Sequence, residues 1–180
     1  MDKNSPESPR PPFSQWWWLA ATWFGCGLSP VMSGTVGSLA ALPFAYLIQH
    51  FGSNKALFLA AAVLFVVGTW ASNLYLLHTG RDDDPSEIVV DEVAGQWLLL
   101  SALYPSWHSY LAGFLLFRAF DIVKPWPVSV ADANIKGGFG VMFDDILAAI
   151  YPIGVFILIA ITAYCFGEEK LLYRWLSFLT

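Results

Sequence analysis

Four long stretches of the chain contain no Asp, Glu, Lys or Arg, and they constrain the fold more than any other feature. They are Val36–Phe51, Ala56–Leu77, Val93–Phe117 and Ile146–Gly167. About 20 consecutive apolar residues form a helix that spans a bilayer, and the second and fourth stretches reach that length. The first is shorter and contains Pro43, so it would span only if tilted or if the bilayer thins locally. The pattern predicts a polytopic membrane protein.

The overall composition supports this prediction and excludes other classes of protein. Hydrophobic residues make up 57% of the 180 residues and charged residues 13%, and the mean hydropathy is +0.56. Such a chain has too few polar side chains to cover a water-facing surface. A net charge of -5 argues against nucleic acid as a partner. Cys26 and Cys165 lie in separate apolar stretches without metal-ligand spacing, so we interpret them as small hydrophobic residues.

The N-terminal segment has a different character from the rest. Residues 1–15 are rich in Pro, Ser and charge, which is typical of a disordered tail. The next segment, WWWLAATWF, is short, rich in Trp and followed by no small-residue cleavage site. These features favour an interfacial helix over a signal peptide. We therefore expect a single membrane-embedded domain over residues 16–180.

The third charge-free stretch carries a turn signal in its middle. Pro105 stands between Tyr104 and Ser106, and polar and aromatic residues typical of a membrane interface follow. This pattern predicts two helices, one from about Ser86 to Tyr104 and one from about Ser109 to Val123. As one unbroken span, the stretch would instead place the acidic segments before and after it on opposite faces of the membrane.

With that division, the sequence predicts an all-α bundle of about five membrane helices, some of them short or tilted. The Gly52-Ser53-Asn54 turn joins the first two helices as an antiparallel hairpin. The loops at residues 25–35, 78–85 and 124–144 then fall on one face. Six of the nine Lys and Arg residues lie on that face, so the positive-inside rule places it in the cytoplasm.

Most of the acidic residues fall on the same predicted face. Ten of the fourteen lie in two segments. These ten are Asp82, Asp83, Asp84, Glu87, Asp91, Glu92, Asp121, Asp132, Asp144 and Asp145. An ionised carboxylate within a membrane helix costs about 2.5–3.5 kcal/mol on insertion scales, and neighbouring carboxylates repel each other. A divalent cation removes that repulsion, and carboxylate oxygens are the ligands that Mg²⁺ prefers.

Some of these acids also have simpler interpretations. Asp144 and Asp145 stand just before the last apolar stretch, where either could cap a helix. Residues 82–84 have the composition of a solvated turn. Glu87 is a separate case, because it stands four residues before Asp91 and on a helix the two would share a face. No such role explains Asp91 and its neighbour Glu92 within the apolar segment IVVDEVAG. We therefore expect these two residues to be functional.

A glycine-rich junction indicates a phosphate site on this face. Gly34, Thr35, Gly37 and Ser38 lie where a loop becomes the first membrane helix. Free N–H groups and the positive end of the helix dipole bind phosphate at such a position. Close helix packing is the alternative role for these glycines.

The segment FRAFDIVKPWP strengthens the prediction of a phosphate site. It introduces Arg118, Asp121 and Lys124 at the edge of an apolar stretch, and Pro125 then ends the helix. The alternative is an interfacial anchor, in which basic side chains extend to the headgroups. Beside a carboxylate cluster, Arg118 and Lys124 indicate a phosphorylated substrate with Mg²⁺.

Four motifs, in this order and spacing, resemble the phosphatidylglycerophosphatase A family: FGCGLSPVMSGTVGSLAALP, IVVDEVAGQW, FRAFDIVKPWP and KGGFGVMFDDILA. The resemblance runs from about Phe24 to Ala149. It implies an all-helical, Mg²⁺-dependent lipid phosphatase of the bacterial inner membrane. The implied substrate is phosphatidylglycerophosphate, and the implied products are phosphatidylglycerol and inorganic phosphate. The matching positions are Gly34, Thr35, Gly37, Ser38, Asp91, Glu92, Arg118, Asp121, Lys124, Pro125, Asp132, Asn134, Gly137, Gly138, Asp144 and Asp145.

The motifs also depart from the family in two places. Ser33 stands where the family usually has Pro. Ala133, between Asp132 and Asn134, stands where it usually has Arg. The loss of that Arg would affect phosphate binding or substrate preference, and it leaves the predicted metal ligands in place.

These residues lead to a hypothesis of metal-assisted phosphomonoester hydrolysis. The candidate Mg²⁺ ligands are Asp91, Glu92, Asp121, Asp144 and Asp145. The candidate phosphate-binding groups are Arg118, Lys124 and the helix start at residues 34–38, with Asp132 and Asn134 nearby. The attacking group is either a metal-activated water, which we favour, or an aspartate that becomes phosphorylated.

Two other functions are compatible with acids on membrane helices. CDP-alcohol phosphotransferases also hold divalent metals with helix acids, but their spaced Asp-Gly, Ala-Arg and paired Asp motif is absent here. A carboxylate-lined ion transporter is the non-enzyme alternative. Acids in a transporter should reach the midplane of the membrane, whereas these acids cluster at helix ends on one side.

Overall fold

The computed structural model describes residues 15–81 and 84–166, and the described residues are helical without any strand. The elements are α1 (Trp16–Ala21), the 3-10 helix η1 (Cys26–Leu28), α2 (Ser33–Phe51), α3 (Asn54–Thr79), α4 (Val90–Ser101), α5 (Trp107–Val123), α6 (Val128–Asn134) and α7 (Gly137–Cys165). The predicted all-α bundle is confirmed. The predicted N-terminal tail, apart from Gln15, and the acids Asp82 and Asp83 lie outside the described residues.

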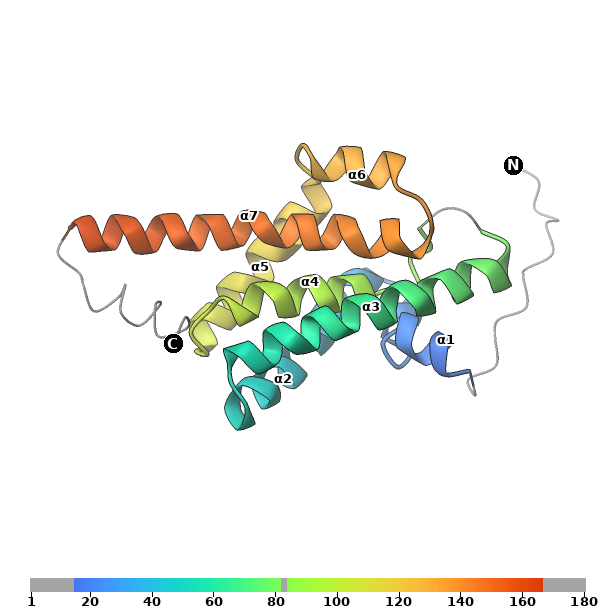
Figure 1. Cartoon of the computed structure of the whole chain (residues 1–180), viewed down its shortest axis with the longest axis horizontal. Helices are drawn as coiled ribbons and strands as arrows, with labels where there is room; N and C mark the ends of the chain where they lie inside the picture. Colours follow the sequence, from blue (N-terminus) through green and yellow to red (C-terminus); the bar gives the residue numbers. More distant parts are fainter. Residues whose placement is uncertain (1–14, 82–83, 167–180) are drawn as a thin grey trace.

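α4 is the central helix of the bundle. It packs against α2, α3, α5 and α7 (Figure 1), and most of its side chains are buried. The Trp97 side chain anchors it to α2 by donating a hydrogen bond from Nε1 to the Ala41 carbonyl oxygen over 3.0 Å. With 12 residues, α4 is about 18 Å long, which is too short to cross a bilayer alone. α4, in which most residues are buried, therefore begins at Val90 with two acids in its first turn.

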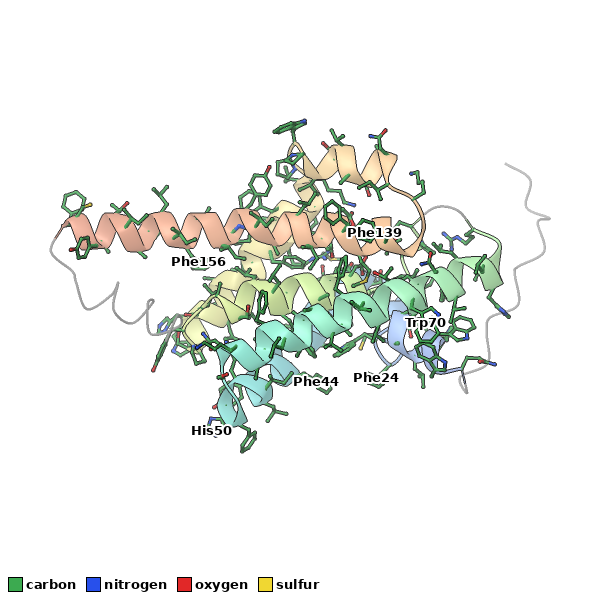
Figure 2. The ribbon with its side chains drawn as sticks, viewed as in Figure 1. Phe24, Phe44, His50, Trp70, Phe139 and Phe156 are labelled. Atoms are coloured by element: carbon green, nitrogen blue, oxygen red, sulfur yellow. The ribbon has the colours of Figure 1, made fainter. Side chains whose placement is uncertain are left out.

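α3 and α7 are long and apolar enough to cross a membrane. They have 26 and 29 residues and run in opposite directions (Figure 1). α3 turns an apolar stripe outward, because Leu59, Val63, Val66 and Trp70 are 61% to 67% exposed. Trp70 is labelled on α3 in Figure 2. This spacing of three and four residues marks one helix face. A soluble protein would bury that face, so its exposure indicates contact with lipid.

Both predicted turns are confirmed, and they lie at the same end of the bundle. Ser53 caps α3 by accepting from the Ala56 N–H, and Ser106 caps α5 by accepting from the Ser109 N–H. The third apolar stretch is thus divided near Pro105, as predicted, into α4 and α5. α2 and α3 form the predicted hairpin across the first turn.

Polar side chains join these two turns. Gln49 of α2 accepts a hydrogen bond from the Tyr110 hydroxyl of α5 and donates to the Leu100 carbonyl oxygen at 2.9 Å. Asn54 donates to the Leu103 carbonyl oxygen at 3.0 Å. These bonds tie the C-terminal end of α4 and the following turn to α2 and α3.

The predicted helix start near Ser86 is wrong, because α4 begins at Val90. The preceding segment is held against the N-terminal elements instead. Val89 donates its N–H to the Ala21 carbonyl oxygen over 2.9 Å, and the Glu87 backbone packs so closely on Gly27 that a side chain there would clash. Glu87 therefore does not share a helix face with Asp91. It forms an ion pair with Arg81 at 3.4 Å.

The predicted loop at residues 124–144 is largely helical. It contains α6 and the first two turns of α7, which begins at Gly137. Asp144 and Asp145 therefore lie well inside α7, and the helix-capping interpretation of these two acids is wrong. A side chain at Gly138 would clash with α3 at Thr69 and Asn73, so this glycine lets the start of α7 pack closely on α3.

Candidate active site

Three carboxylates from two helices converge inside the bundle, at the end where α4 begins. Asp91 and Glu92 come from the first turn of α4, and Asp145 comes from α7. One carboxylate oxygen from each residue lies within 4.8 Å of the other two. α4 and α7 approach closely because Gly95 has no side chain, and a Cβ there would lie 2.9 Å from the Asp145 carbonyl oxygen. The sequence prediction that these acids meet is therefore correct in geometry.

The carboxylates of this cluster are buried and incompletely bonded. Asp91, Asp144 and Asp145 are 5%, 3% and 3% exposed. Within the described part of the chain, one oxygen of each, and Oε2 of Glu92, is buried without a hydrogen-bond partner. Buried acceptors without donors are costly, and unpaired buried charges cost more. A divalent cation would satisfy these oxygens, so the residues present fit a magnesium-type site.

Arg118 and Asp121 bring α5 to the same cluster. Arg118 lies 3.6 Å from Glu92 and forms a second, closer ion pair with Asp121, three residues later on the helix. Arg118 and Asp121 are both largely buried. The Arg118 Nε atom has no hydrogen-bond partner among the described residues. The positive charge of Arg118 therefore compensates the negative charges of Glu92 and Asp121, and its Nε remains a donor for another anion.

Lys124 occupies the end of α5 in a left-handed backbone conformation with φ of 43°. Its Nζ donates to Asp132 of α6 at 2.7 Å and to Asp144 of α7 at 2.6 Å. Partial burial would lower the pKa of the Lys124 ammonium group, but these two carboxylates outweigh burial and raise it above the usual range. Lys124 therefore keeps its positive charge at every physiological pH. Pro125 follows and ends the helix, as predicted.

The start of α2 lies directly against this cluster. A Cβ at Gly34 would clash with the Glu92 carboxylate and would lie 3.0 Å from an Arg118 nitrogen. Thr35, the next residue, buries its Oγ1 without a hydrogen-bond partner in the described ranges. The other two predicted residues of this segment have packing roles here. Gly37 contacts Val89, and Ser38 donates to the Gly34 carbonyl oxygen at 2.8 Å.

α6 contributes one predicted residue to the cluster and turns another away. Asp132 binds Lys124, whereas the exposed Asn134 donates to the Val130 carbonyl oxygen of its own helix over 2.7 Å. Asn134 makes no contact with the carboxylates in this arrangement.

Asp84 is a neighbour of the site that sequence reasoning missed. Part of its surface is exposed, yet crowding by protein atoms, and then the charges of Asp144 and Glu92, raise the pKa of Asp84 to about 7. Together with Asp132, it lines a small cleft at the edge of the cluster. The run of three consecutive aspartates at residues 82–84 was the available signal, and it was interpreted as a solvated turn.

The fold and the site define the class of protein: an all-helical membrane protein with buried acids beside Arg and Lys, as phosphoryl-group chemistry requires. The comparison with known families agrees. The chain belongs to the phosphatidylglycerophosphatase A family, whose model matches residues 19–160. It is therefore an enzyme of the phosphatase class.

Curated relatives support this assignment. The chain is 41% identical to "Phosphatidylglycerophosphatase A" of Escherichia coli over 144 residues, which cover 77% of this chain and 80% of the relative. It is also 41% identical to "Putative phosphatidylinositol-3-phosphatase" of Bacteroides thetaiotaomicron over 83% of this chain and 94% of the relative. A third, "Phosphatidylglycerophosphatase A" of Haemophilus influenzae, is 38% identical over 75% and 83%. No solved structure matches the chain.

Proposed function

We propose that this protein hydrolyses phosphatidylglycerophosphate to phosphatidylglycerol and inorganic phosphate in a Mg²⁺-dependent reaction. The observation that carries the proposal is the convergence of Asp91, Glu92 and Asp145, with Arg118 and Lys124 beside them. Acids alone would suit a cation transporter. Acids with two buried or half-buried basic groups suit a substrate that is itself an anion.

The metal would be held by Asp91, Glu92 and Asp145, whose oxygens lie closest to one another. Bound there, Mg²⁺ supplies charge neutralisation for phosphate oxygens. Asp121 and Asp144, the other predicted ligands, are paired with Arg118 and Lys124 respectively. In this arrangement they orient the two basic side chains.

Arg118 and Lys124 would bind the terminal phosphate. Lys124 is a fixed positive charge because of its two carboxylate partners, so it acts as a phosphate-binding group and not as a base. Arg118 offers its Nε donor, and its guanidinium group lies beside Gly34 and Glu92. The first N–H groups of α2 would supply further donors to the phosphate.

We place the site at the cytoplasmic face of the bacterial inner membrane, in a multi-pass protein. The cluster lies at the end of the bundle that carries Arg81, Arg118, Lys124 and Lys136, and positively charged ends face the cytoplasm. There a lipid phosphate reaches the acids without leaving the bilayer surface.

The test is phosphate release from phosphatidylglycerophosphate by the purified protein, with and without EDTA, and for Asp91→Asn and Asp145→Asn. We expect EDTA to abolish release, Mg²⁺ to restore it, and each variant to lose about 100-fold or more in activity. Full activity in EDTA, or in both variants, would refute the metal proposal.

The Bacteroides relative gives a second candidate substrate, phosphatidylinositol-3-phosphate. It shares with phosphatidylglycerophosphate a phosphomonoester on a headgroup that a phosphodiester joins to diacylglycerol. The same assay with both lipids decides between them. We expect the larger kcat/KM for phosphatidylglycerophosphate, because two of the three relatives carry its name.

A further inference from the structure

A cavity of about 490 Å³ lies where α3 ends and α7 begins. Asn73, Leu76, Leu77, Arg81 and Lys136 contribute to its lining. None of these residues belongs to the carboxylate cluster, and the hydrolysis proposed above gives the cavity no role. Its volume is within the range of small-molecule sites.

The polar part of the lining is suited to an anion. Lys136 and Arg81 supply two positive charges, and no acidic side chain is among the described residues that line the cavity. The Asn73 Oδ1 atom accepts a hydrogen bond from the Gly138 N–H at 2.7 Å. The amide nitrogen of the same side chain is then the end that can donate to an anion. Arg81 also pairs with Glu87 at 3.4 Å, a partly exposed contact that positions it beside the cavity.

The backbone around Lys136 is fixed in place. Gly137 has φ of 75°, a left-handed conformation that favours glycine. Gly138 lies so close to α3 that a Cβ there would be 2.6 Å from the backbone nitrogen of Asn73. These two glycines hold the start of α7 against α3. Lys136, at the N-cap of α7, is therefore presented at a defined position beside Asn73.

The cavity adjoins the acidic site without sharing its metal ligands. Lys136 and Gly137 also line the small cleft that Asp84 and Asp132 border. Asp132 binds Lys124, the proposed phosphate-binding residue, at 2.7 Å. An anion beside Lys136 would thus lie next to the terminal phosphate site and on the same face of the protein.

One wall of the cavity is apolar and continues onto the lipid-facing surface. Leu76 and Leu77 form this wall, and Leu77 is 79% exposed on α3, one of the two helices long enough to span a membrane. The cavity thus has basic groups on one side and leucines on the other. A phospholipid changes in the same way from its charged phosphate to its glycerol backbone.

We propose that this cavity binds the phosphodiester of the same lipid whose terminal phosphate lies at the acidic site, with Lys136 as its main contact. The inference rests on the proposed function, because it concerns lipids that carry both phosphates. Phosphatidylglycerophosphate and phosphatidylinositol-3-phosphate do so, whereas phosphatidic acid has a phosphomonoester alone. The cavity would thus select lipids with a phosphorylated headgroup over phosphatidic acid.

A kinetic comparison tests the proposal with the full-length protein in micelles of dodecyl maltoside, a detergent without a phosphodiester. For Lys136→Ala, we expect the KM for phosphatidylglycerophosphate to rise about tenfold, since a charge-assisted hydrogen bond is lost, with little change in kcat. Inhibition by inorganic phosphate should stay the same. Lys55→Ala removes the same charge at the other end of α3 and should leave KM unchanged. An unchanged KM in Lys136→Ala, or a KM equally raised in Lys55→Ala, would overturn the proposal.

A binding measurement decides the matter independently of catalysis. Phosphatidylglycerol has the phosphodiester without the phosphomonoester. Its binding to purified protein in dodecyl maltoside micelles, which contain no competing phosphodiester, is measured by mass spectrometry and reports this cavity. We expect Lys136→Ala to bind it about tenfold more weakly, and Lys55→Ala to bind it like the wild type. Equal binding by Lys136→Ala and wild type contradicts the proposal. If the wild type hydrolyses neither phosphatidylglycerophosphate nor phosphatidylinositol-3-phosphate, the proposed function fails. The binding of phosphatidylglycerol still tests the cavity, because it does not depend on hydrolysis.

Discussion

At the scale of single residues, Gly34 shows how the site depends on a missing side chain. It faces Glu92 of α4 and Arg118 of α5, so three helices meet at one Cα position. A Cβ at this position would clash with the Glu92 carboxylate, so glycine is the residue that fits here. The sequence pattern alone left two roles for this glycine, phosphate binding and helix packing. The structure shows close packing of three helices at Gly34, and phosphate binding there stays a prediction.

We expect Gly34→Ala to lower kcat/KM by about 100-fold or more. The added methyl group would clash with the Glu92 carboxylate and crowd the Arg118 guanidinium, so both groups would have to move away from their positions in the site. Phosphate release from phosphatidylglycerophosphate measures the effect. Gly154→Ala is the matched control, since a Cβ there meets nothing within 4 Å and alanine favours the helix. Normal activity in Gly34→Ala would show that this contact is not part of the site.

At the scale of elements, the two turns at the end of the bundle remote from the site act together. Gln49 links α2 to α5 through the Tyr110 hydroxyl and to α4 through the Leu100 carbonyl. This network fixes the short helix α4, which carries the acids at its other end. Stability of the remote turns therefore contributes to the position of the acids.

Tyr110→Phe should destabilise the protein by about 1–3 kcal/mol, because the buried Gln49 oxygen loses its donor. The thermal unfolding midpoint in detergent measures the loss, and activity at low temperature should remain. Tyr46→Phe serves as the control, because the Tyr46 ring is half exposed and stacks on His50. If the two variants unfold at the same temperature, the network does not stabilise the bundle.

The elements also show what a sequence can and cannot predict. Charge-free runs and the turn at Pro105 predicted the helices and their division, because lipid and turn chemistry act locally. The start of α4 was misplaced, since the hydrogen bond from Val89 to Ala21 comes from a distant segment. α6 was missed because it is short and its burial depends on α7.

The same distinction holds for the site. Asp91 and Glu92 were predicted because acids in an apolar helix need an explanation. The ion pairs of Arg118 with Glu92 and of Lys124 with Asp144 depend on how helices far apart in the sequence pack, which no local pattern specifies.

At the scale of the whole molecule, the account requires that α3 crosses the membrane with the acidic site on the cytoplasmic side. In a protein with Cys26→Ala and Cys165→Ala, we expect Ser86→Cys to react with an impermeant maleimide only in inside-out vesicles. Lys55→Cys, at the other end of α3, should react only in intact spheroplasts. Labelling of both positions from one side would show that α3 does not span, and reversed labelling would place the site outside the cytoplasm.

The central claim is that Asp91, Glu92 and Asp145 together hold a divalent cation. Binding of Mn²⁺, which shares the preference of Mg²⁺ for oxygen ligands, to purified EDTA-treated protein tests it most directly by electron paramagnetic resonance. We predict saturable binding by the wild type, binding at least about tenfold weaker in Asp145→Asn, and unchanged binding in Glu87→Gln, whose acid pairs with Arg81 outside the cluster. Equal Mn²⁺ affinity in Asp145→Asn and wild type, or no saturable binding by the wild type, would contradict the account.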